Sequence, residues 1–538
     1  MKNEKGQAIL IVVVALGIFL IAGVGLALDL SQLYAHEQMA QIAADSAAEA
    51  AMMSIFQGVN DATDNPNTYF PTSAFTCASG SAQVPCAYAR MNGFGLSSDT
   101  IKVSYPDCPY ASCSTLISPS SVQVTVSRQV TNSFIRMIGG PAITTISATG
   151  IAATLQVKAP IPILIIHPTL SSSLQGNGNT NLAIMGGPTR SIQVNSNCNV
   201  GITCYTDNAH KGSTAYGGGF ASIDLHLGGP NYDFSAGICA SGQKCGSDFG
   251  VFGGPASQPS EINFGDTGKY RPQASPIPDP LLFVLPPGQG SGDPILNAGS
   301  TQTVRSTDNP NYGCTGTCTL YRPGTYSGGI QVKNQNAIFM PGVYVMQNGS
   351  GFTDGPNGNS QMCVVSQPTL PPGATWPSVG AGCVADLNGQ TGNGMVVYNQ
   401  GGGQFSVGAN GNAYLQGSLD TDASGNPARY AGMLFFEDRT APANNQSTHN
   451  PHVIGGGGTL ILYGTIYTTN TAKSIKTTPS TYQEIELHGN PGGNTYLVGE
   501  IITDALSLKG TSTIKMVLSA LAFLKVQQVA LVGGGPHL

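Results

Sequence analysis

Three groups of ionisable residues in the C-terminal half of this 538-residue chain have types and spacings that could support catalysis. They are Glu437-Asp438-Arg439, the pair His449 and His452, and Glu484 with Glu486 and His488. Glycoside hydrolysis needs two carboxyl groups that converge on one bond, and lyase chemistry needs a base with charge stabilisation. Adjacent strand residues point to opposite faces, so we interpret the first group as a salt-bridged turn. We interpret the histidine pair as surface residues of a polar loop and the third group as an exposed strand face.

The rest of the sequence carries no catalytic signature. It has no phosphate-binding glycine loop, no G-x-S-x-G nucleophile elbow and no Cys-x-x-Cys redox pair. We therefore expect a protein that is not an enzyme, with no catalytic residues, no cofactor and no metal site. A periplasmic carbohydrate-active enzyme stays open as a lesser alternative, because parallel β-helices include polysaccharide-cleaving enzymes.

Twelve cysteines fall into near neighbours along the chain, which predicts small loops closed by disulfides in an oxidising compartment. Sequence alone does not fix the connectivity, and zinc is the weaker alternative because nearby histidines are sparse. The neighbouring pairs are Cys77/Cys86, Cys108/Cys113, Cys198/Cys204, Cys239/Cys245, Cys314/Cys318 and Cys363/Cys383.

An uncharged apolar stretch from Ile9 to Leu28 predicts one membrane-spanning helix near the N-terminus. About 20 apolar residues at 1.5 Å each cross a hydrocarbon core of about 30 Å. Lys2 and Lys5 precede the stretch, and the next Lys or Arg is Arg90, so the positive-inside rule keeps the N-terminus in the cytoplasm. We predict a cytoplasmic tip at 1–6 and a transmembrane helix at 7–28. A cleaved signal peptide is the alternative.

The helix is expected to continue as a stalk over residues 29–58, because this segment is rich in alanine and has no proline. Asp45 and Glu49 share one face of it, which we interpret as a solvated face. Residues 59–157 contain a short helical segment and alternating strand patterns, for example at Ser121–Val126, and they predict a small α+β domain.

The N-terminal segment resembles the TadG-like N-terminal family of Flp (tight adherence) pilus assembly. The resemblance implies an inner-membrane protein with a periplasmic C-terminal part that assembles or anchors an adhesive pilus. Gly6 is followed by Gln7, with Ile11 at the fifth position where pilin precursors carry Glu, so processing as a pilin is not expected. The residues that carry the resemblance are Gly6, Gln7, Ala8, Asp29, Tyr34, Gln41, Ala43, Ala44, Asp45, Ala47 and Ala48.

Residues 158–538 are rich in glycine and asparagine and contain short β-prone runs such as Met433–Phe436 and Leu460–Tyr463. The tetrapeptide Pro323-Gly324-Thr325-Tyr326 returns 18 residues later at Pro341–Tyr344. This spacing predicts a large all-β domain, as a parallel β-helix or β-solenoid, with a β-sandwich as the alternative. Met516–Phe523 is predicted to be the last solenoid strand or a strand that meets a partner.

Charged residues make up only 9% of the chain, and the net charge is −6. Nucleic-acid binding needs clustered Lys and Arg, so it is excluded from the expected functions. The expected partners are the inner membrane and other pilus-assembly proteins, either Tad-type pseudopilins or the secretion apparatus. The expected function is scaffolding or tethering. A surface adhesin that binds cell-surface polysaccharide through the solenoid is the alternative.

Overall fold

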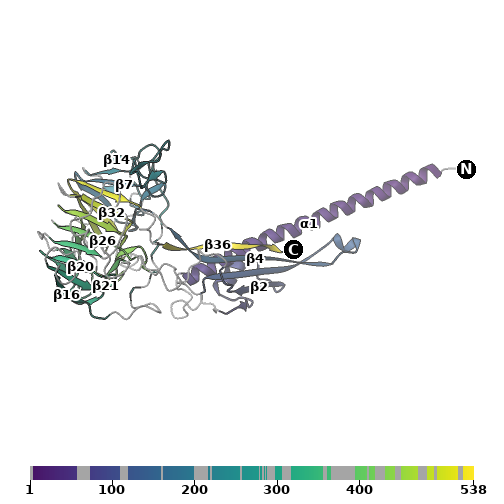
Figure 1. Cartoon of the computed structure of the whole chain (residues 1–538). Helices are drawn as coiled ribbons and strands as arrows, with labels where there is room; N and C mark the ends of the chain where they lie inside the picture. Colours follow the sequence, from purple (N-terminus) through teal and green to yellow (C-terminus); the bar gives the residue numbers. More distant parts are fainter. Residues whose placement is uncertain are drawn as a thin grey trace. The chain divides into compact units, whose positions relative to one another are not determined.

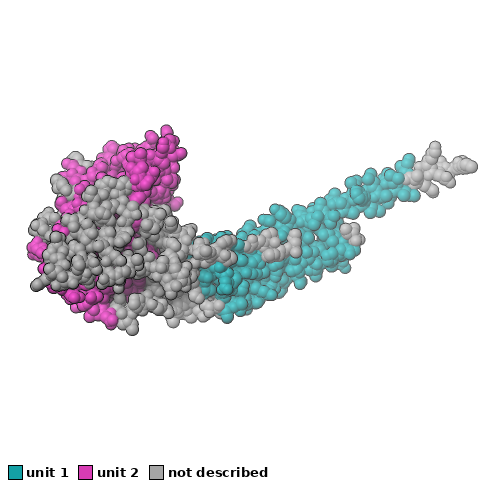
Figure 2. All heavy atoms as spheres, in the orientation of Figure 1, with its two compact units in different colours: residues 1–157, 526–538 teal, residues 158–525 magenta. Residues whose placement is uncertain are grey.

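A computed structural model of the chain forms two compact units, residues 1–157 with 526–538 and residues 158–525 (Figure 1, Figure 2). The structure describes residues 4–56, 73–108, 119–158, 161–198, 216–217, 221–254, 257–277, 279–281, 284, 286–287, 297–305, 317–354, 360–364, 394–408, 411–418, 430–442, 450–470, 482–489, 494–518 and 525–537.

Unit 1 consists of a long helix, α1 (Glu4–Phe56), and a five-stranded sheet. The sheet order is β1 (Phe75–Thr76), β2 (Asp99–Ser104), β3 (Ser121–Thr131), β4 (Ile143–Lys158) and β36 (Lys525–His537), with β1 to β4 antiparallel. The helix α2 (Val84–Met91) and the 3-10 turn η1 (Ile135–Ile138) complete the unit. Val122, Val124 and Val126 of β3 are buried, as expected for a half-buried strand.

The C-terminal end departs from the prediction that 158–538 forms one domain. Strand β36 pairs with β4 and belongs to unit 1. Unit 2 is therefore an insertion between two neighbouring strands of the unit 1 sheet. The local sequence of β36 is β-prone in either location, and only its pairing assigns it to unit 1.

Unit 2 has three long sheets of parallel strands, one of which ends in an antiparallel strand. The first sheet has the order β14 (Ile262–Asn263), β10 (Ser222–Asp224), β7 (Asn181–Met185), β35 (Thr513–Val517), β32 (Asn494–Val498), β29 (Thr459–Tyr463), β26 (Asn412–Gln416), β23 (Gln361–Val364), β20 (Asn336–Phe339), β17 (Thr317–Arg322) and β16 (Ser300–Arg305). The second has the order β15 (Tyr270–Pro272), β13 (Asp248–Val251), β8 (Arg190–Val194), β5 (Ile163–Ile165), β33 (Ile501–Thr503), β30 (Thr465–Thr468), β27 (Met433–Glu437), β24 (Met395–Asn399), β21 (Gly342–Met346) and β18 (Gly324–Tyr326).

The third sheet has the order β19 (Ile330–Val332), β22 (Phe352–Asp354), β25 (Phe405–Val407), β28 (His452–Ile454), β31 (Glu484–Gly489), β34 (Ala505–Gly510), β6 (Leu174–Gly178) and β9 (Tyr216–Gly217). A separate hairpin joins β11 (Tyr232–Asp233) and β12 (Ile238–Cys239). Successive turns of chain place one strand in each long sheet, so the prediction of a β-solenoid is confirmed and the β-sandwich alternative is wrong. We call each such turn of chain a rung.

One rung of the solenoid is composite, because it combines β35 from the C-terminal end of the domain with β5 and β6 from its start. Strand β35, near the C-terminal end of the domain, pairs with β32 on one side and with β7 on the other. The first strands of the domain, β5 and β6, continue the other two sheets from β33 and β34. The prediction that Met516–Phe523 forms the last solenoid strand is confirmed in chain order for its described part, because Met516 and Val517 end β35. In space, however, β35 lies within the stack and not at its end.

The repeated Pro-Gly-x-Tyr sequence forms a corner between the first and second sheets. The Tyr326 hydroxyl donates to the Arg322 carbonyl at 2.6 Å, and the Tyr344 hydroxyl donates to the Met340 carbonyl at 2.6 Å. Tyr344 also donates to the Tyr321 carbonyl in the preceding rung at 3.0 Å. Gly324 and Gly342 have φ values of +146° and +135°, which favour glycine. Each motif thus turns the chain, and the second one also links two rungs.

Aromatic side chains stack from rung to rung inside the solenoid. The ring centroids of Phe352 and Phe405 are 5.8 Å apart, and those of Phe405 and Phe435 are 4.3 Å apart. All three side chains are buried. Full burial of one such side chain contributes about 1.5–3 kcal/mol, so this stack is a main source of the domain's stability.

Candidate functional site: the motif helix and its sheet

One face of α1 is buried from Gly25 to Ala51, with buried residues recurring every three or four positions. This spacing matches the 3.6-residue period of a helix whose single face packs on a neighbour. Most of the residues on this face are small, so the helix axis can approach the sheet closely. We call this face the inner row, defined by Gly25, Asp29, Leu33, Glu37, Ala40, Ala44, Ala47 and Ala51.

Asp29 joins the helix to the turn between β3 and β4. Its carboxylate accepts backbone N–H groups from Ile135 and Phe134, each at 2.7 Å, and from Ser133 at 3.2 Å. The bond from Ile135, with those from Phe134 and Ser133, holds the pKa of Asp29 below its ordinary value despite the opposing effect of desolvation. The motif aspartate is therefore an ionised cap for η1.

Gly25 lies one helical turn before Asp29 and meets the same segment. A Cβ added to Gly25 would lie 2.5 Å from the Phe134 ring, closer than side-chain atoms can approach. A larger residue here would push Phe134 away from the helix. The Gly25 and Asp29 pair thus fixes where the β3–β4 turn docks on α1.

The alanine-rich part of the motif makes the closest approach to the sheet. A Cβ on Gly150 of β4 would lie 2.6 Å from the Ala44 carbonyl group, so backbone meets backbone there. Gln41 Nε2 donates to Asp45 Oδ1 at 2.7 Å and to the Thr149 carbonyl at 3.3 Å. Asp45 is half-buried and Glu49 is exposed, so the predicted solvated face holds for Glu49 only.

The remaining motif residues divide between packing and solvent. Ala43, Ala47 and Ala48 are completely buried, whereas the Tyr34 side chain is 64% exposed. The side chains of Gly6, Gln7 and Ala8 lie outside the described residues. Most of the motif that could be placed therefore serves the docking of α1 onto its own sheet.

The N-terminal half of α1 is apolar and uncovered. Large side chains from Ile9 to Leu28 are mostly exposed, for example Phe19 at 75%. In the described residues this is the one helix long and apolar enough to cross a membrane. One continuous helix therefore has an apolar half of the kind that spans a bilayer or serves as a signal, and a second half built into a folded unit.

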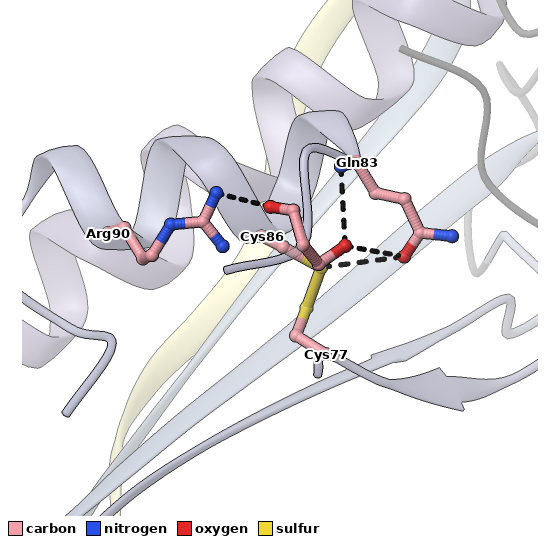
Figure 3. Close-up of a disulfide and its surroundings, with 5 residues drawn as sticks. Cys77, Gln83, Cys86 and Arg90 are labelled. Atoms are coloured by element: carbon pink, nitrogen blue, oxygen red, sulfur yellow. Dashed lines mark hydrogen bonds between the residues drawn. A yellow bond between two sulfur atoms is a disulfide. The ribbon is translucent and has the colours of Figure 1, made fainter. Parts of the chain in front are cut away.

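A disulfide reinforces the α2 side of unit 1. Cys77 and Cys86 are bonded, and Arg90 donates to the Ser81 carbonyl within the loop that they close (Figure 3). The bond ties the start of α2 to the segment that follows β1.

An ion pair lies on the same side of the unit. Arg128 donates to both carboxylate oxygens of Asp99, at 2.7 and 2.8 Å. Burial alone would raise the pKa of Asp99, but the bonds from Arg128 and two backbone N–H groups lower it. Sequence reasoning missed this pair, because the partners are 29 residues apart.

The other cysteines follow the same pattern where they are described. Cys239 is bonded to Cys245. Four further cysteines are also disulfide-bonded, and their predicted partners lie outside the described residues. The four are Cys108, Cys198, Cys318 and Cys363, and the predicted partners are Cys113, Cys204, Cys314 and Cys383.

The histidine pair does not form the predicted surface site. His452 lies fully buried in β28, where its Nδ1 accepts the Phe405 N–H at 2.9 Å, and burial lowers its pKa to about 3. Its Nε2 lies 3.5 Å from Glu437 Oε2. The surface interpretation of His452 is wrong because the residue occupies an inward strand position beside Phe405. His449 lies outside the described residues.

Glu437 is also buried and is held by few donors. Asn399 Nδ2 donates to its Oε2 at 2.8 Å, while Oε1 has no hydrogen-bond partner among the described residues. Desolvation therefore raises its pKa well above the ordinary value. A carboxyl enclosed in this way cannot reach a polysaccharide.

The two residues that follow Glu437, namely Asp438 and Arg439, form structural contacts. Asp438 accepts the Tyr398 hydroxyl and a backbone N–H from the turn that follows it. Arg439 donates to Tyr467 Oη at 2.7 Å, and its Nε lies 3.9 Å from Asp279 Oδ2. The predicted salt bridge is therefore not formed within the triplet. Arg439 pairs instead with Asp279 and holds that segment against the second sheet.

The prediction of an exposed face on β31 is wrong for two of its three residues. Glu484 and Glu486 are buried, and His488 is partly exposed. Ser507 donates to Glu484 Oε1 at 2.7 Å, and Glu486 is bridged by Lys509 and by His488 at 2.8 Å. Side chains of the next strand, β34, therefore contact both carboxylates. In the described part of the chain no group of three His, Cys, Asp or Glu side chains could hold a metal ion.

The fold and the site define a protein with one long N-terminal helix. The first half of this helix is apolar and mostly exposed, and the second half packs on a small antiparallel sheet. Residues 6–54 match the family described as "Putative Flp pilus-assembly TadE/G-like", so the predicted resemblance is confirmed for this segment. The match is limited to residues 6–54, which lie within α1.

Among solved structures, the chain is similar to the competence-associated pilin ComZ from Thermus thermophilus. The two are 9% identical, with 92% of this chain and 97% of that chain covered and a TM-score of 0.22. That score does not establish a shared fold. No curated protein matches the sequence significantly.

Proposed function

We propose that this protein is a membrane-anchored structural component of Flp/Tad pilus assembly. Its N-terminus lies in the cytoplasm, and its two folded units lie on the far side of the inner membrane, where they scaffold or tether the pilus. The observation that carries the proposal is α1 itself. The segment that matches the pilus-assembly family is one helix with an uncovered apolar half and a half docked on its own sheet.

The disulfides support the proposed location. Every cysteine in the described part of the chain is disulfide-bonded, and none of them lies in α1. Such bonds persist in the periplasm and are rare in the cytosol. The absence of Lys and Arg between Lys5 and Arg90 supports the same orientation.

The proposed role involves no bond chemistry. The carboxylates that sequence spacing singled out are buried among their own partners, as described for Glu437, Glu484 and Glu486. Among the described residues none of these groups converges on an open groove. Surface complementarity to other pilus-assembly proteins therefore fits the molecule better than glycoside cleavage.

Pilus counts by electron microscopy in a deletion strain test this function. The strain is complemented with the full chain, or with a chain in which residues 158–525 are replaced by a short Gly-Ser linker that joins β4 to β36. We expect pili to vanish on deletion and to return with the full chain. Normal piliation in the deletion strain would overturn the proposal and make polysaccharide binding by unit 2 the next hypothesis to test.

A matched pair of variants tests whether the docked half of α1 matters. Ala44→Leu adds bulk at the closest approach to the sheet, whereas Ala27→Leu adds the same bulk at an exposed position. We expect Ala44→Leu to reduce piliation and Ala27→Leu to preserve it, at equal protein levels by immunoblot. Equal piliation with both variants would contradict a role for the docked helix.

A further inference from the structure

A second row of residues along α1 is apolar or small and faces away from the sheet. Spacings of three, four and eleven residues place its positions on one helical face. Its large side chains are well exposed, from 43% for Met39 to 67% for Ile21. We call it the outer row, defined by Gly17, Ile21, Val24, Leu28, Met39 and Ile42.

The outer row continues beyond the membrane segment. Met39 and Ile42 follow the predicted membrane exit at Leu28, and the row extends about 20 Å past it. A bilayer needs no apolar residues there. The exposed Ile42 side chain, at 58%, is therefore unexplained by anchoring alone.

Helix α2 adds apolar surface beside the C-terminal end of the outer row. Asn92 Nδ2 donates to Ser46 Oγ at 3.3 Å, which places the end of α2 beside the turn that follows Ile42. A Cβ on Gly93 would lie 3.7 Å from Met39 Cε. Met91, exposed by 77%, belongs to this same end of α2 and adds apolar surface.

The row carries no charge. From residue 6 to residue 42 the Asp, Glu, Lys and Arg side chains are Asp29 and Glu37, and both are buried on the side of the helix that faces the sheet. Gly17 has no atom of the protein within 4 Å of the position of an added Cβ. Small residues of this kind let transmembrane helices approach closely.

We infer that the outer row is the contact surface between two copies of this chain, with their α1 helices parallel. The inference rests on the proposed anchoring, because two copies in one membrane share an orientation and bring identical residues to the same height. Such a contact is isologous: each residue of the row meets the same surface of the partner. Ile21, Leu28 and Ile42 are separated by multiples of seven residues, the repeat that keeps a seam between two parallel helices.

The contact would extend from Gly17 to Ile42, about 37 Å along the helix axis. Its lower part packs helix on helix in the bilayer, and its upper part buries Met39, Ile42 and Met91 from water. Only the upper part gains hydrophobic free energy on contact, because its side chains leave water. The lower part gains none, because lipid tails are as apolar as its side chains.

Oxidative cross-linking of the full chain tests the inference in vesicles of phosphatidylethanolamine and phosphatidylglycerol. Each variant adds one cysteine: Leu28→Cys or Ile42→Cys in the row, or Leu30→Cys off it. Leu28 and Leu30 are matched, at 54% and 53% exposed, and lie two residues apart. We expect disulfide-linked dimer from Leu28→Cys and Ile42→Cys at about tenfold the yield from Leu30→Cys.

Equal yields at the three positions, or no dimer at positions 28 and 42, would overturn the inference. Mapping of the Cys77–Cys86 bond by mass spectrometry confirms that each variant is folded. The outcome is separable from the proposed function. If no cross-links form but the deletion strain lacks pili, the dimer contact is overturned and the assembly function still stands. If cross-links form but the deletion strain has normal pili, the assembly function is overturned and the dimer contact still stands.

Discussion

The two units of this protein bury carboxyl groups in opposite ways. In unit 1 three backbone N–H groups meet Asp29, and its pKa falls below the ordinary value. In unit 2 one amide meets Glu437 inside an aromatic core, and desolvation raises its pKa. The comparison teaches that N–H donors lower the pKa of a carboxyl and desolvation raises it, and that donors prevail at Asp29 whereas desolvation prevails at Glu437.

The units also differ in how they fill space. The α1–sheet interface uses alanine and glycine, which bring backbones together, whereas the solenoid fills each rung with large side chains such as Phe405. Unit 1 is therefore sensitive to added volume and unit 2 to removed volume. Hydrogen exchange read by mass spectrometry on peptides of each unit can separate the two responses in the full chain.

The largest expected effect comes from Phe405→Ala. The substitution removes a ring stacked on Phe352 and Phe435 and leaves a cavity, which costs about 3–5 kcal/mol. Exchange should rise in peptides from β22, β25 and β27, while peptides of unit 1 keep their protection. Unchanged protection of these solenoid peptides would contradict the aromatic stack as a main source of stability.

Gly150→Val tests the opposite sensitivity. The new side chain meets the Ala44 backbone at 2.6 Å, and overpacking of this kind costs about 1–3 kcal/mol. Exchange should rise in β3, β4 and the second half of α1, with the solenoid unaffected. As a control, Gly139→Val changes a position with nothing within 4 Å of its added Cβ, although its φ of +86° carries a backbone cost of its own.

Glu437→Gln tests the buried carboxyl in the solenoid. With a raised pKa, Glu437 stays protonated in the folded state while the unfolded chain loses that proton above its ordinary pKa. Stability is therefore full below the unfolded value and falls as pH rises toward the folded pKa, by about 1.4 kcal/mol per pH unit for one proton. The Glu437→Gln variant should flatten this slope above the ordinary glutamate pKa in exchange experiments on β24 and β27. An unchanged slope would show that Glu437 is ionised in the fold.

Asp29→Asn should give the smallest effect, with the opposite sign. Because the folded pKa is lowered, Asp29 contributes stability above its unfolded pKa, and this is lost as pH falls through the folded value. The variant should weaken protection of residues 133–138 at neutral pH and lose less on acidification than the parent. Equal acid sensitivity in both proteins would argue against ionised Asp29 as the cap.

Local patterns predicted the elements, and long-range contacts decided their roles. The apolar runs at Met433–Phe436 and Leu460–Tyr463 form strands as expected, and the alanine-rich stalk is helical. Composition could not show that β35 pairs with β7, because strand pairing between distant parts of the chain leaves no local signal. The burial of His452 was hidden for a related reason, since the residue directly follows Asn450-Pro451, a dipeptide that is typical of loops.

The family motif illustrates a third limit. Sequence reasoning identified Asp29 and the alanines as a pattern, but not Phe134, Ile135 and Gly150, the residues that they contact. Those partners lie in a turn and a strand without unusual composition. The available sequence signal was an aspartate one turn after a glycine at the end of an apolar span. Such an aspartate needs hydrogen-bond donors from another segment if the fold buries it.

The composite rung has a consequence for damage to the chain. A protease that cuts one exposed loop of unit 2 leaves two fragments, one connected to β4 and the other to β36. Because β35 pairs with β7, and β33 pairs with β5, strands of the two fragments pair directly with each other at the junction. A nicked molecule therefore keeps both pieces on the anchored unit. The first piece is covalently continuous with β4, and the second is held by the pairing of β36 with β4 and by backbone hydrogen bonds at the junction.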